Sequence, residues 1–428
     1  MNYESLENWR YMKHIIKLLG LWFCMASSLS AHAQVPVLSL DTVLQRIDNG
    51  NLLLQSYGLK ASAYKYSAEA ATAWMAPMVG VGTFMTPYPG QRKTDDMSKG
   101  NLMLQLEQDI PNTAKQQSKK QYIASLGDVE NANRAVTLND LKAQARRLYF
   151  NWLIAREKIQ LLQQNEKIMV MMKKIEEVRY PYNQSQLGSV YRADAKIEEN
   201  RNMIRMQEGL IAKARSWMNS LMNAPGNQLF EIDTTYVPLF VAAAAYDTTT
   251  LAGVRKDVLK MNESIRSMQL NIASMKNERK PDFRIRFEHM HPLSNIMPYA
   301  YSVMGMVSIP IVPWASKMYK SEIRAMQYNV EGMQKERAAM LQETQGMLYG
   351  MQYEIQTMQT RITAKSDKVI PALQKSMDAD FAKYQENTLP LAQVIGSWEA
   401  LTMMQVEVLD EKLKLYEMIA DYEKQLYR

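Results

Sequence analysis

The chain carries the same set of landmarks twice, about 203 residues apart. Three pairs of residues mark this repeat, namely Pro77 with Pro281 (281 − 77 = 204), Pro111 with Pro313 (313 − 111 = 202) and Tyr182 with Tyr384 (384 − 182 = 202). Each half is predicted to contain a helix, two strands, a long helix, a turn and a returning helix. A duplicated unit of this kind normally packs against its own copy, so the repeat limits the folds that the chain can adopt.

The first 33 residues are predicted to be a signal peptide. Basic residues precede an apolar run at 18–26, and an Ala-x-Ala cleavage pattern follows at 31–33. The apolar run is too short to span a bilayer. Met12 is a second candidate for the start of translation. The only cysteine, Cys24, lies in this segment, so we expect neither disulfides nor thiolate metal sites in the rest of the chain.

Four segments are predicted to be strands, at about 77–87, 100–110, 281–291 and 299–311. Apolar and polar residues alternate along them, as in Leu102, Leu104 and Leu106 against Met103, Gln105 and Glu107, or Phe283, Ile285 and Phe287 against Arg284, Arg286 and Glu288. Period two predicts strands with one apolar and one polar face. A soluble sheet with one buried face has this pattern, and so does a transmembrane β-barrel with a polar lumen.

Very long helices are the second prominent feature. Residues 113–177 contain no proline and one glycine, Gly127, and a helix of that length is on the order of 100 Å long. Its counterpart is predicted at 314–369, the returning helices at 190–223 and 390–427, and the first helix at 39–74. Heptad-like stripes indicate that these helices pack side by side as coiled coils.

The chain is therefore predicted to be mostly α with a four-strand β contribution. The first structural repeat covers 34–224, with its tip near 179–190, and the second covers 251–428, with its tip near 378–391. Residues 225–250 are rich in proline, aspartate and threonine and are predicted to be a linker with a short equatorial element.

In combination, the motifs at the tips and at the repeat boundaries resemble those of the TolC-type outer-membrane efflux family. At the second tip, Tyr384-Gln-Glu-Asn387 and the following Leu-Pro-Leu391-Ala-Gln-Val394 are similar to the family's turn, with Asn387 where glycine is usual. Asparagine is the next-best residue for a positive φ. Tyr182 to Gly188 is similar but shorter, Arg255-Lys-Asp257-Val258 resembles the opening of the family's second half, and Asn51 stands at the matching place in the first. The resemblance is nearest to the heavy-metal (copper/silver) efflux branch.

This resemblance implies a passive duct in the outer membrane of a Gram-negative bacterium, extending into the periplasm. It implies a homotrimer with a periplasmic α-barrel and one 12-stranded β-barrel, four strands from each of three protomers. Four amphipathic strands cannot close alone, and open sheet edges are not tolerated in lipid, so this interpretation requires trimerisation. It also implies a periplasmic adaptor (membrane fusion) protein, an inner-membrane pump of the resistance-nodulation-division type, and contact with outer-membrane lipid. No enzyme activity, cofactor or nucleic-acid partner is expected.

The two tips are the predicted contact sites for the adaptor. The residues expected to contact it are Leu187, Gly188 and Ser189 at the first tip and Leu389, Pro390 and Leu391 at the second. Residues near the tips are also candidates for contacts that close the duct, and these are Arg179, Tyr182, Asp194, Tyr384 and Gln393. The family's acidic ring falls on Gln393 and Gly396, which are not acidic here.

Methionine is abundant, with 33 residues in the chain. Thioethers are soft ligands suited to Cu(I) and Ag(I), but a heptad stripe of methionines usually fills a helix seam. Nine methionines at heptad spacing are therefore expected to pack between helices: Met261, Met268, Met275, Met326, Met333, Met340, Met347, Met351 and Met358. Candidate transient metal contacts are the strand methionines on the predicted lumen side, Met103, Met290, Met304 and Met306, together with His289 and His291, which share the parity of the apolar face.

Other functions stay open at the level of sequence. The substrate could be a heavy-metal cation, or the chain could be a generic drug efflux or type I secretion duct. A different class of protein, a periplasmic coiled-coil adaptor or scaffold, would also contain long helical hairpins. The residues offer no catalytic constellation and no phosphate-binding loop, so energy for transport would have to come from a partner.

Overall fold

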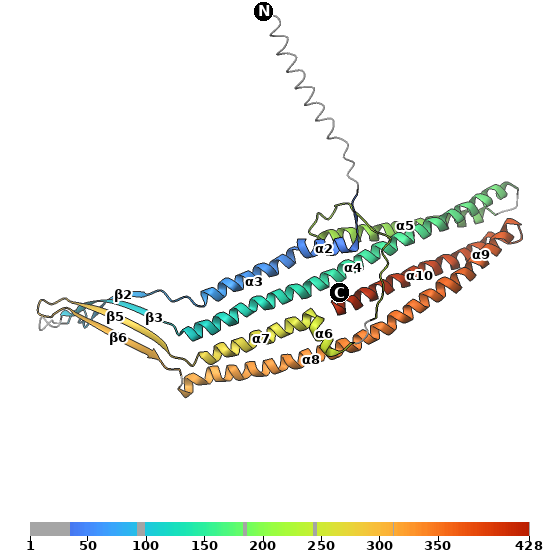
Figure 1. Ribbon diagram of the computed structural model, residues 1–428. Helices are drawn as coiled ribbons and strands as arrows, with labels where there is room; N and C mark the ends of the chain where they lie inside the picture. Colours follow the sequence, from blue (N-terminus) through green and yellow to red (C-terminus); the bar gives the residue numbers. More distant parts are fainter. Residues whose placement is uncertain (1–34, 92–98, 183–185, 243–245, 311, 428) are drawn as a thin grey trace, which may run out of the picture.

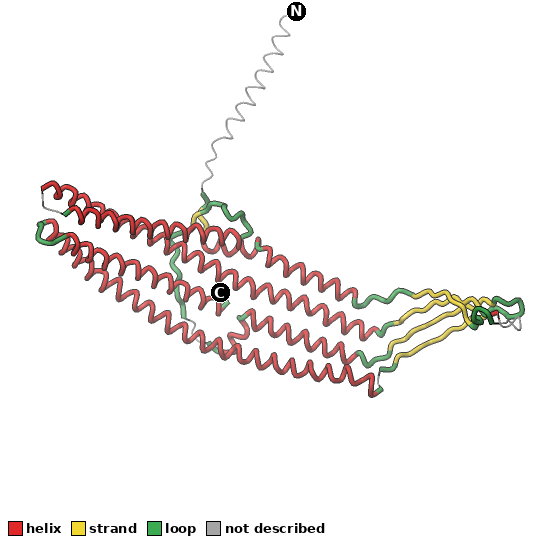
Figure 2. The backbone as a smooth tube through the Cα atoms, turned by 180° about the vertical axis from the view of Figure 1, so that it is seen from behind, coloured by secondary structure: helices red, strands yellow, loops and turns green. Residues whose placement is uncertain are grey.

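The computed structural model describes residues 35–91, 99–182, 186–242, 246–310 and 312–427. The predicted signal peptide lies outside these residues. The molecule is long and curved, with strands at one end and two helical tips at the other (Figures 1 and 2). As expected, it is mostly helical with a few strands.

The strands form one antiparallel sheet in the order β2-β3-β5-β6. Their bounds are Met78–Phe84 for β2, Asn101–Ile110 for β3, Asp282–Pro292 for β5 and Ala300–Ser308 for β6. The outer edges of β2 and β6 have no neighbouring strand within the described chain. Since β5 pairs with β3, the centre of the sheet joins the two halves of the sequence.

Four helices continue the four strands in the same order. These are α3 (Leu52–Ala70), α4 (Thr113–Arg179), α7 (Lys256–Asn277) and α8 (Pro313–Ala364). The helix α4 packs against α3 and α7, and α7 packs against α8, so that α3 and α8 lie at the two edges of a curved layer (Figure 2).

The tip half of the layer is built from two helical hairpins. The helix α4 is paired with α5 (Leu187–Leu221), and α9 (Ile370–Gln385) with α10 (Leu391–Leu426), which also packs on α4. Helix α8 reaches α9 through a π-helix at Lys365–Val369, just before Pro371. Proline has no N–H to donate, so the local bonding pattern changes there.

The predicted single helix at 39–74 is wrong at Asn51. The chain forms α2 (Leu40–Gly50) and then α3, because the Asn51 side chain accepts hydrogen bonds from the N–H groups of Leu53 and Leu54 and donates one to the carbonyl of Leu221. Arg255 makes the corresponding break between α6 (Thr248–Val254) and α7.

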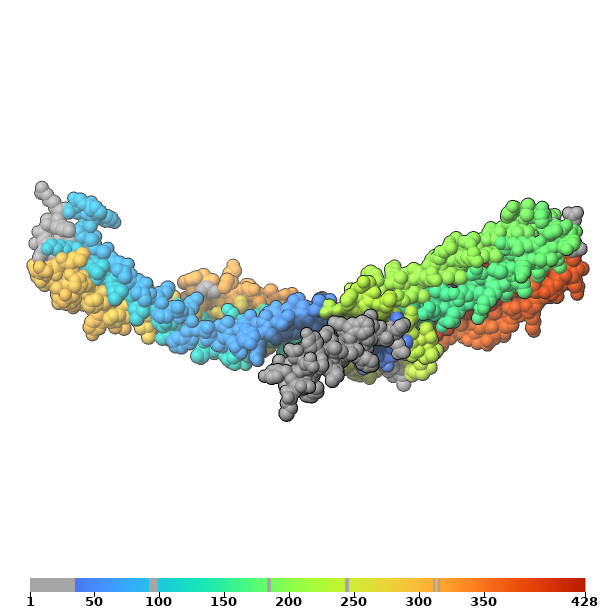
Figure 3. Space-filling model, turned by 90° about the horizontal axis from the view of Figure 1, so that it is seen from above, coloured from blue at the N-terminus to red at the C-terminus, as the bar shows by residue number. Residues whose placement is uncertain are grey.

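The main hydrophobic core lies at the middle of the molecule. A short parallel pair, β1 (Val37–Leu38) with β4 (Glu231–Ile232), covers α4 there. The largest buried side chains of the cluster include Trp152, Phe150 and Tyr422, and the Tyr149 hydroxyl donates to the carbonyl of Asp233 at 2.7 Å. The two ends extend from this core in opposite directions, and the whole molecule forms a shallow curve (Figure 3).

Candidate functional site

One face of the sheet is apolar and exposed. Its exposed residues are Val79, Val81, Leu102, Leu104, Leu106, Phe283, Ile285, Phe287, Tyr301, Val303 and Val307. A sheet in a soluble domain normally buries such a face against another layer. Here the band crosses all four strands, and its size is typical of a surface that contacts lipid or another protein.

Aromatic residues lie at both ends of this band. At the end near the helices, Trp74 and Trp314 are 58% and 79% exposed. At the far end, the ring of Tyr299 lies 5.0 Å from that of His291 and 6.3 Å from that of His289. Aromatic girdles flank the lipid-facing band of transmembrane β-barrels, and exposed aromatic residues lie at both ends of this band.

The opposite face of the sheet carries a network of charges. The buried Glu107 carboxylate lies 2.7 Å from the guanidinium groups of both Arg284 and Arg286. Arg284 also donates to Asp109 at 2.6 Å, and Gln105 donates to Glu107 at 3.1 Å. The sequence analysis did not identify this network. The sequence does contain the signal for it, because acidic residues alternate along one strand and basic residues along another, each on the polar face.

The four strand methionines lie on the charged face. Met103 is directly opposite Met290, Met304 is opposite Arg286, and Met306 is opposite Arg284. His289 and His291 lie on the apolar face, beside Tyr299. The six candidate metal contacts are therefore divided between the two faces of the sheet.

Several of the heptad methionines pack between helices, as expected, whereas Met347 is 41% exposed. Met261, Met268, Met326 and Met333 pack around Ile265, Ile272 and Val330 between α7 and α8. In the described part of the chain, no group of three or more His, Cys, Asp or Glu side chains is arranged to hold a metal ion.

At the tips, the structure brings two of the five predicted closure residues together. The Arg179 guanidinium donates to the carbonyls of Tyr384 and Gln385 at 3.0 and 2.8 Å and lies 4.8 Å from the centre of the Tyr384 ring. The Tyr384 hydroxyl donates to Glu176 at 2.6 Å. Burial, followed by this hydrogen bond, raises the pKa of Tyr384. These contacts lock α9 to α4 within one chain.

The other three closure candidates are placed elsewhere. Asp194 pairs with Lys173 at 2.6 Å, and the hydrogen bond between them raises the pKa of the Lys173 ammonium group. Tyr182 and Gln393 are exposed and lie outside the Arg179–Tyr384 contact. Residues 183–185 of the first tip lie outside the described residues.

The second tip turns at Asn387, whose φ of 63° confirms the expected positive φ. Of the predicted contact residues, Leu187, Gly188 and Pro390 are exposed, whereas Ser189 and Leu389 are half-buried. Leu391 was wrongly placed at the surface, because it is 3% exposed and packs into the tip core.

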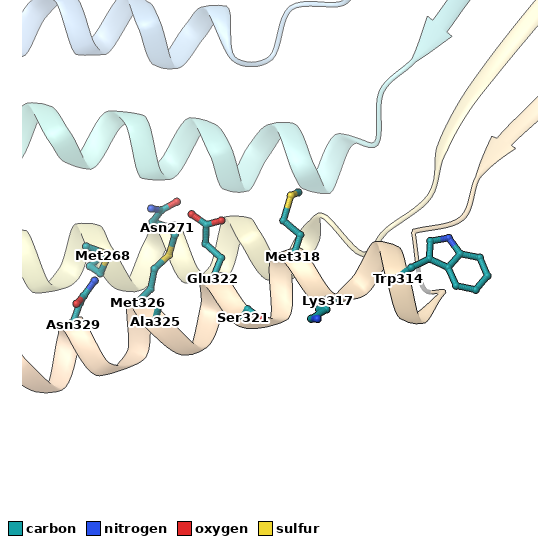
Figure 4. A pocket seen from close by; sticks show the side chains of 10 residues that line it. All are labelled: Met268, Asn271, Trp314, Lys317, Met318, Ser321, Glu322, Ala325, Met326 and Asn329. Carbon is teal, nitrogen blue, oxygen red and sulfur yellow. The ribbon is translucent and has the colours of Figure 1, made fainter.

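A groove of about 810 Å³ lies along the open edge of the layer, between α7 and α8. Its lining includes Met268, Met318, Met326 and Trp314, and Figure 4 shows Trp314 at the strand end of the groove. The sequence analysis treated Met268 and Met326 as seam residues and missed the groove beside them.

Solved structures with this architecture include two channel proteins, CusC and MtrE, and the outer-membrane protein VceC. CusC has a TM-score of 0.73 at 14% identity and covers 93% of this chain and 95% of its own. VceC of Vibrio cholerae has a TM-score of 0.68 at 11% identity, with coverage of 90% and 95%. MtrE of Neisseria gonorrhoeae has a TM-score of 0.68 at 14% identity, with coverage of 91% and 88%.

No protein-family model and no curated protein sequence matches the chain. None of the described helices is both long and apolar enough to cross a membrane. Because the likeness to the solved channels extends over nine-tenths of the chain at low identity, it establishes that this chain has their fold.

Proposed function

We propose that this protein is the outer-membrane channel of a tripartite efflux system, as in the TolC-type family. The sheet would lie in the outer membrane and the helices in the periplasm of a Gram-negative cell. The observation that carries the proposal is the exposed apolar face of the four strands, backed by a charged face. In a transmembrane β-barrel, the apolar face would contact the lipid outside and the charged face would contact the water inside.

The channel would be a trimer. Each chain supplies four strands whose outer edges, on β2 and β6, are unpaired within the described chain. Unpaired edges cannot be left in lipid, and three copies of four strands would give a closed barrel of twelve. The long helices would continue the barrel wall toward the periplasm.

The experiment that tests this function combines localisation, assembly and conductance. The protein should be recovered from the outer-membrane fraction, should need detergent, and should form trimers that open ion-conducting pores in planar bilayers. A monodisperse monomer that stays in solution without detergent would instead favour the periplasmic adaptor or scaffold.

The groove in Figure 4 is the proposed contact for α3 of the next subunit. Gln116 donates to the carbonyls of Thr72 and Ala73, and Asn277 donates to that of Ala114, so Trp74 lies at the level of the helix ends that border the groove. Trp74 is exposed on one edge of the layer, and the groove lies at the other.

We expect Trp74→Asp to lower the trimer fraction strongly, because burying such a side chain is worth about 1.5–3 kcal/mol at each of three interfaces. The trimer fraction would be measured by light scattering after size-exclusion chromatography in detergent. Met403→Asp is the control, since Met403 is exposed on α10, away from both edges of the strand-side layer. Equal trimer content in both variants would contradict this interface.

The proposed substrates are soft cations, Cu(I) or Ag(I). The direct pairing of Met103 with Met290 supports this, because two thioethers on one face can contact a passing soft ion. The carboxylates on this face, Glu107 and Asp109, are already paired with Arg284 and Arg286, so they would add little to such contacts. Weak contacts suit a duct, which must release what it carries.

Changing Met103, Met290, Met304 and Met306 together to Leu should raise the copper and silver sensitivity of cells and leave drug sensitivity unchanged. Met-to-Leu swaps nearly conserve volume and cost less than ~1.5 kcal/mol each, so trimers should persist. The control changes four heptad methionines outside the groove, Met261, Met333, Met351 and Met358, to Leu. Unaltered metal tolerance in the strand variant would favour a generic drug efflux or secretion duct.

The proposed partners follow from the same architecture. The tips would contact a periplasmic adaptor protein, and an inner-membrane pump of the resistance-nodulation-division type would supply the energy. This chain has no phosphate-binding loop of its own to bind ATP.

A further inference from the structure

The junction between helices and strands is strongly basic. The segments 111–120, 274–282 and 313–324 contain nine basic and three acidic side chains, a net charge of +6. Residues 34–428 contain 48 basic and 42 acidic side chains, which is also +6 (51 − 3 and 44 − 2 after removal of residues 1–33). The rest of that stretch is therefore neutral, and the positive charge is concentrated at one level of the molecule.

Most of these basic side chains have no acidic partner in the part of the chain that the structure describes. Lys115 pairs with Asp282 at 2.7 Å and with Glu278 at 3.7 Å. Within the described chain, no ion pair forms at the other eight, which are Lys119, Lys120, Lys276, Arg279, Lys280, Lys317, Lys320 and Arg324. On the charged face of the neighbouring sheet, by contrast, Arg284 and Arg286 form ion pairs with Glu107 and Asp109.

Four of the eight form one surface, which we name the basic collar: Lys276, Lys280, Lys320 and Arg324. Lys276 and Arg324 line a single groove between α7 and α8. Lys320 precedes Arg324 by four residues on α8, which places these two on one stripe of the helix. Lys280 lies in the turn that follows α7, between Lys276 and the start of β5. Glu331 lines the same groove, but seven residues beyond Arg324 toward the tips.

The basic collar lies on the side of the layer that continues the apolar face of the sheet. Glu278 forms an ion pair with Lys115, and Lys115 also pairs with Asp282. In β5, Asp282 lies on the charged face of the sheet, together with Arg284 and Arg286. Lys276 is two residues before Glu278, about 200° round the helix, and so lies on the opposite side. Along the long axis, Trp314 in the first turn of α8 marks the level just before Lys320 and Arg324, although it lines the other groove of the α7–α8 pair.

We propose that the basic collar binds the phosphate groups of anionic phospholipids in the leaflet next to the helices. This inference rests on the proposed function, since it needs the apolar band to lie in a bilayer. The collar would then be at headgroup depth, just beyond the interfacial tryptophan. Unpaired lysine and arginine side chains near a membrane surface attract anionic lipid, and each contributes a similar amount. Anionic lipid would thereby fix the depth of the barrel.

The test compares lipid retention by the purified trimer. The protein would be placed in nanodiscs of mixed phosphatidylglycerol and phosphatidylcholine, released, and its bound lipid counted by native mass spectrometry. The wild type should retain phosphatidylglycerol in preference to phosphatidylcholine. Replacing all four collar residues (K276Q, K280Q, K320Q and R324Q) should reduce this preference by at least ~10-fold.

The matched control removes the same charge from the tip half. K167Q, K174Q, K213Q and K375Q change four exposed lysines that have no ion pair in the described chain, and the lipid preference should stay at the wild-type value. A collar variant that keeps its preference would overturn the inference, as would a control that loses it equally. Displacement of the lipid by millimolar inorganic phosphate would also overturn it, by showing a free-anion site.

Failure of the lipid-binding proposal can be distinguished from failure of the proposed channel function. A trimer that enters both lipids equally well, without headgroup preference, contradicts the collar and leaves the channel intact. A chain that enters no bilayer of either composition contradicts the channel, and the collar with it.

Discussion

Val303→Arg should abolish insertion into the outer membrane. Val303 lies near the middle of β6, on the apolar face, and is 64% exposed. An arginine on the lipid face of a transmembrane β-barrel costs about 2–4 kcal/mol at the bilayer midplane, and a trimer contains the change three times. Heat-modifiable migration and the yield of protein in the outer-membrane fraction would measure the loss.

The control is the adjacent residue on the same strand. Ser302 has the parity of the charged face and is paired with Glu288, so Ser302→Arg would place its guanidinium in the lumen beside a carboxylate. This variant should insert and assemble normally. If the sheet were exposed to water, as in a soluble adaptor, Val303→Arg would be harmless, and equal yields from the two variants would exclude the lipid-facing assignment.

Alternation and helix length could be predicted because they are local properties. Leu102, Leu104 and Leu106 share a face whatever strand lies beside them, and the absence of proline from 113–177 allows one continuous helix, observed as Thr113–Arg179. The positive φ of Asn387 was predictable for the same reason, since few residues tolerate that conformation.

The features that sequence could not give depend on distant contacts. The helix break at Asn51 is stabilised by the carbonyl of Leu221, 170 residues away. Leu391 follows a proline in a turn, which indicates exposure, yet Met169 and Met172 of the other hairpin belong to the cluster that buries it. Parity placed Met103 and Met290 on one face, but only the register of β3 against β5 puts them directly opposite each other.

The tips combine a rigid interior with an exposed apolar rim. Arg179, Tyr384 and Glu176 fix α9 against α4, and Leu391 anchors the start of α10 in the tip core. Leu187, at the start of α5, is 42% exposed at the end of the first hairpin. A rigid hairpin that presents an apolar residue is suited to docking, because little conformational entropy is lost when a partner binds.

Leu187→Asp should therefore abolish export while trimers and pores remain. The change places a charge where the proposed adaptor would bury an apolar side chain, and it leaves the Arg179–Tyr384 contact and the tip core untouched. Export would be measured as the resistance of cells to the transported substrate, and assembly as trimer content and single-channel conductance. Chemical cross-linking to the adaptor should fall in parallel with export.

The control is Leu210→Asp on the same helix. Leu210 is also 42% exposed but lies 23 residues from Leu187, about 35 Å along α5. Equal exposure means that the two substitutions have similar costs in the isolated chain, so a difference in export reports on position alone. Leu391→Asp separates docking from folding, because a charge in the buried tip core should disorder the tip and change pore conductance as well. Normal export by the Leu187 variant would remove the first tip from the adaptor contact and leave the second, at Leu389 and Pro390, as the remaining docking surface.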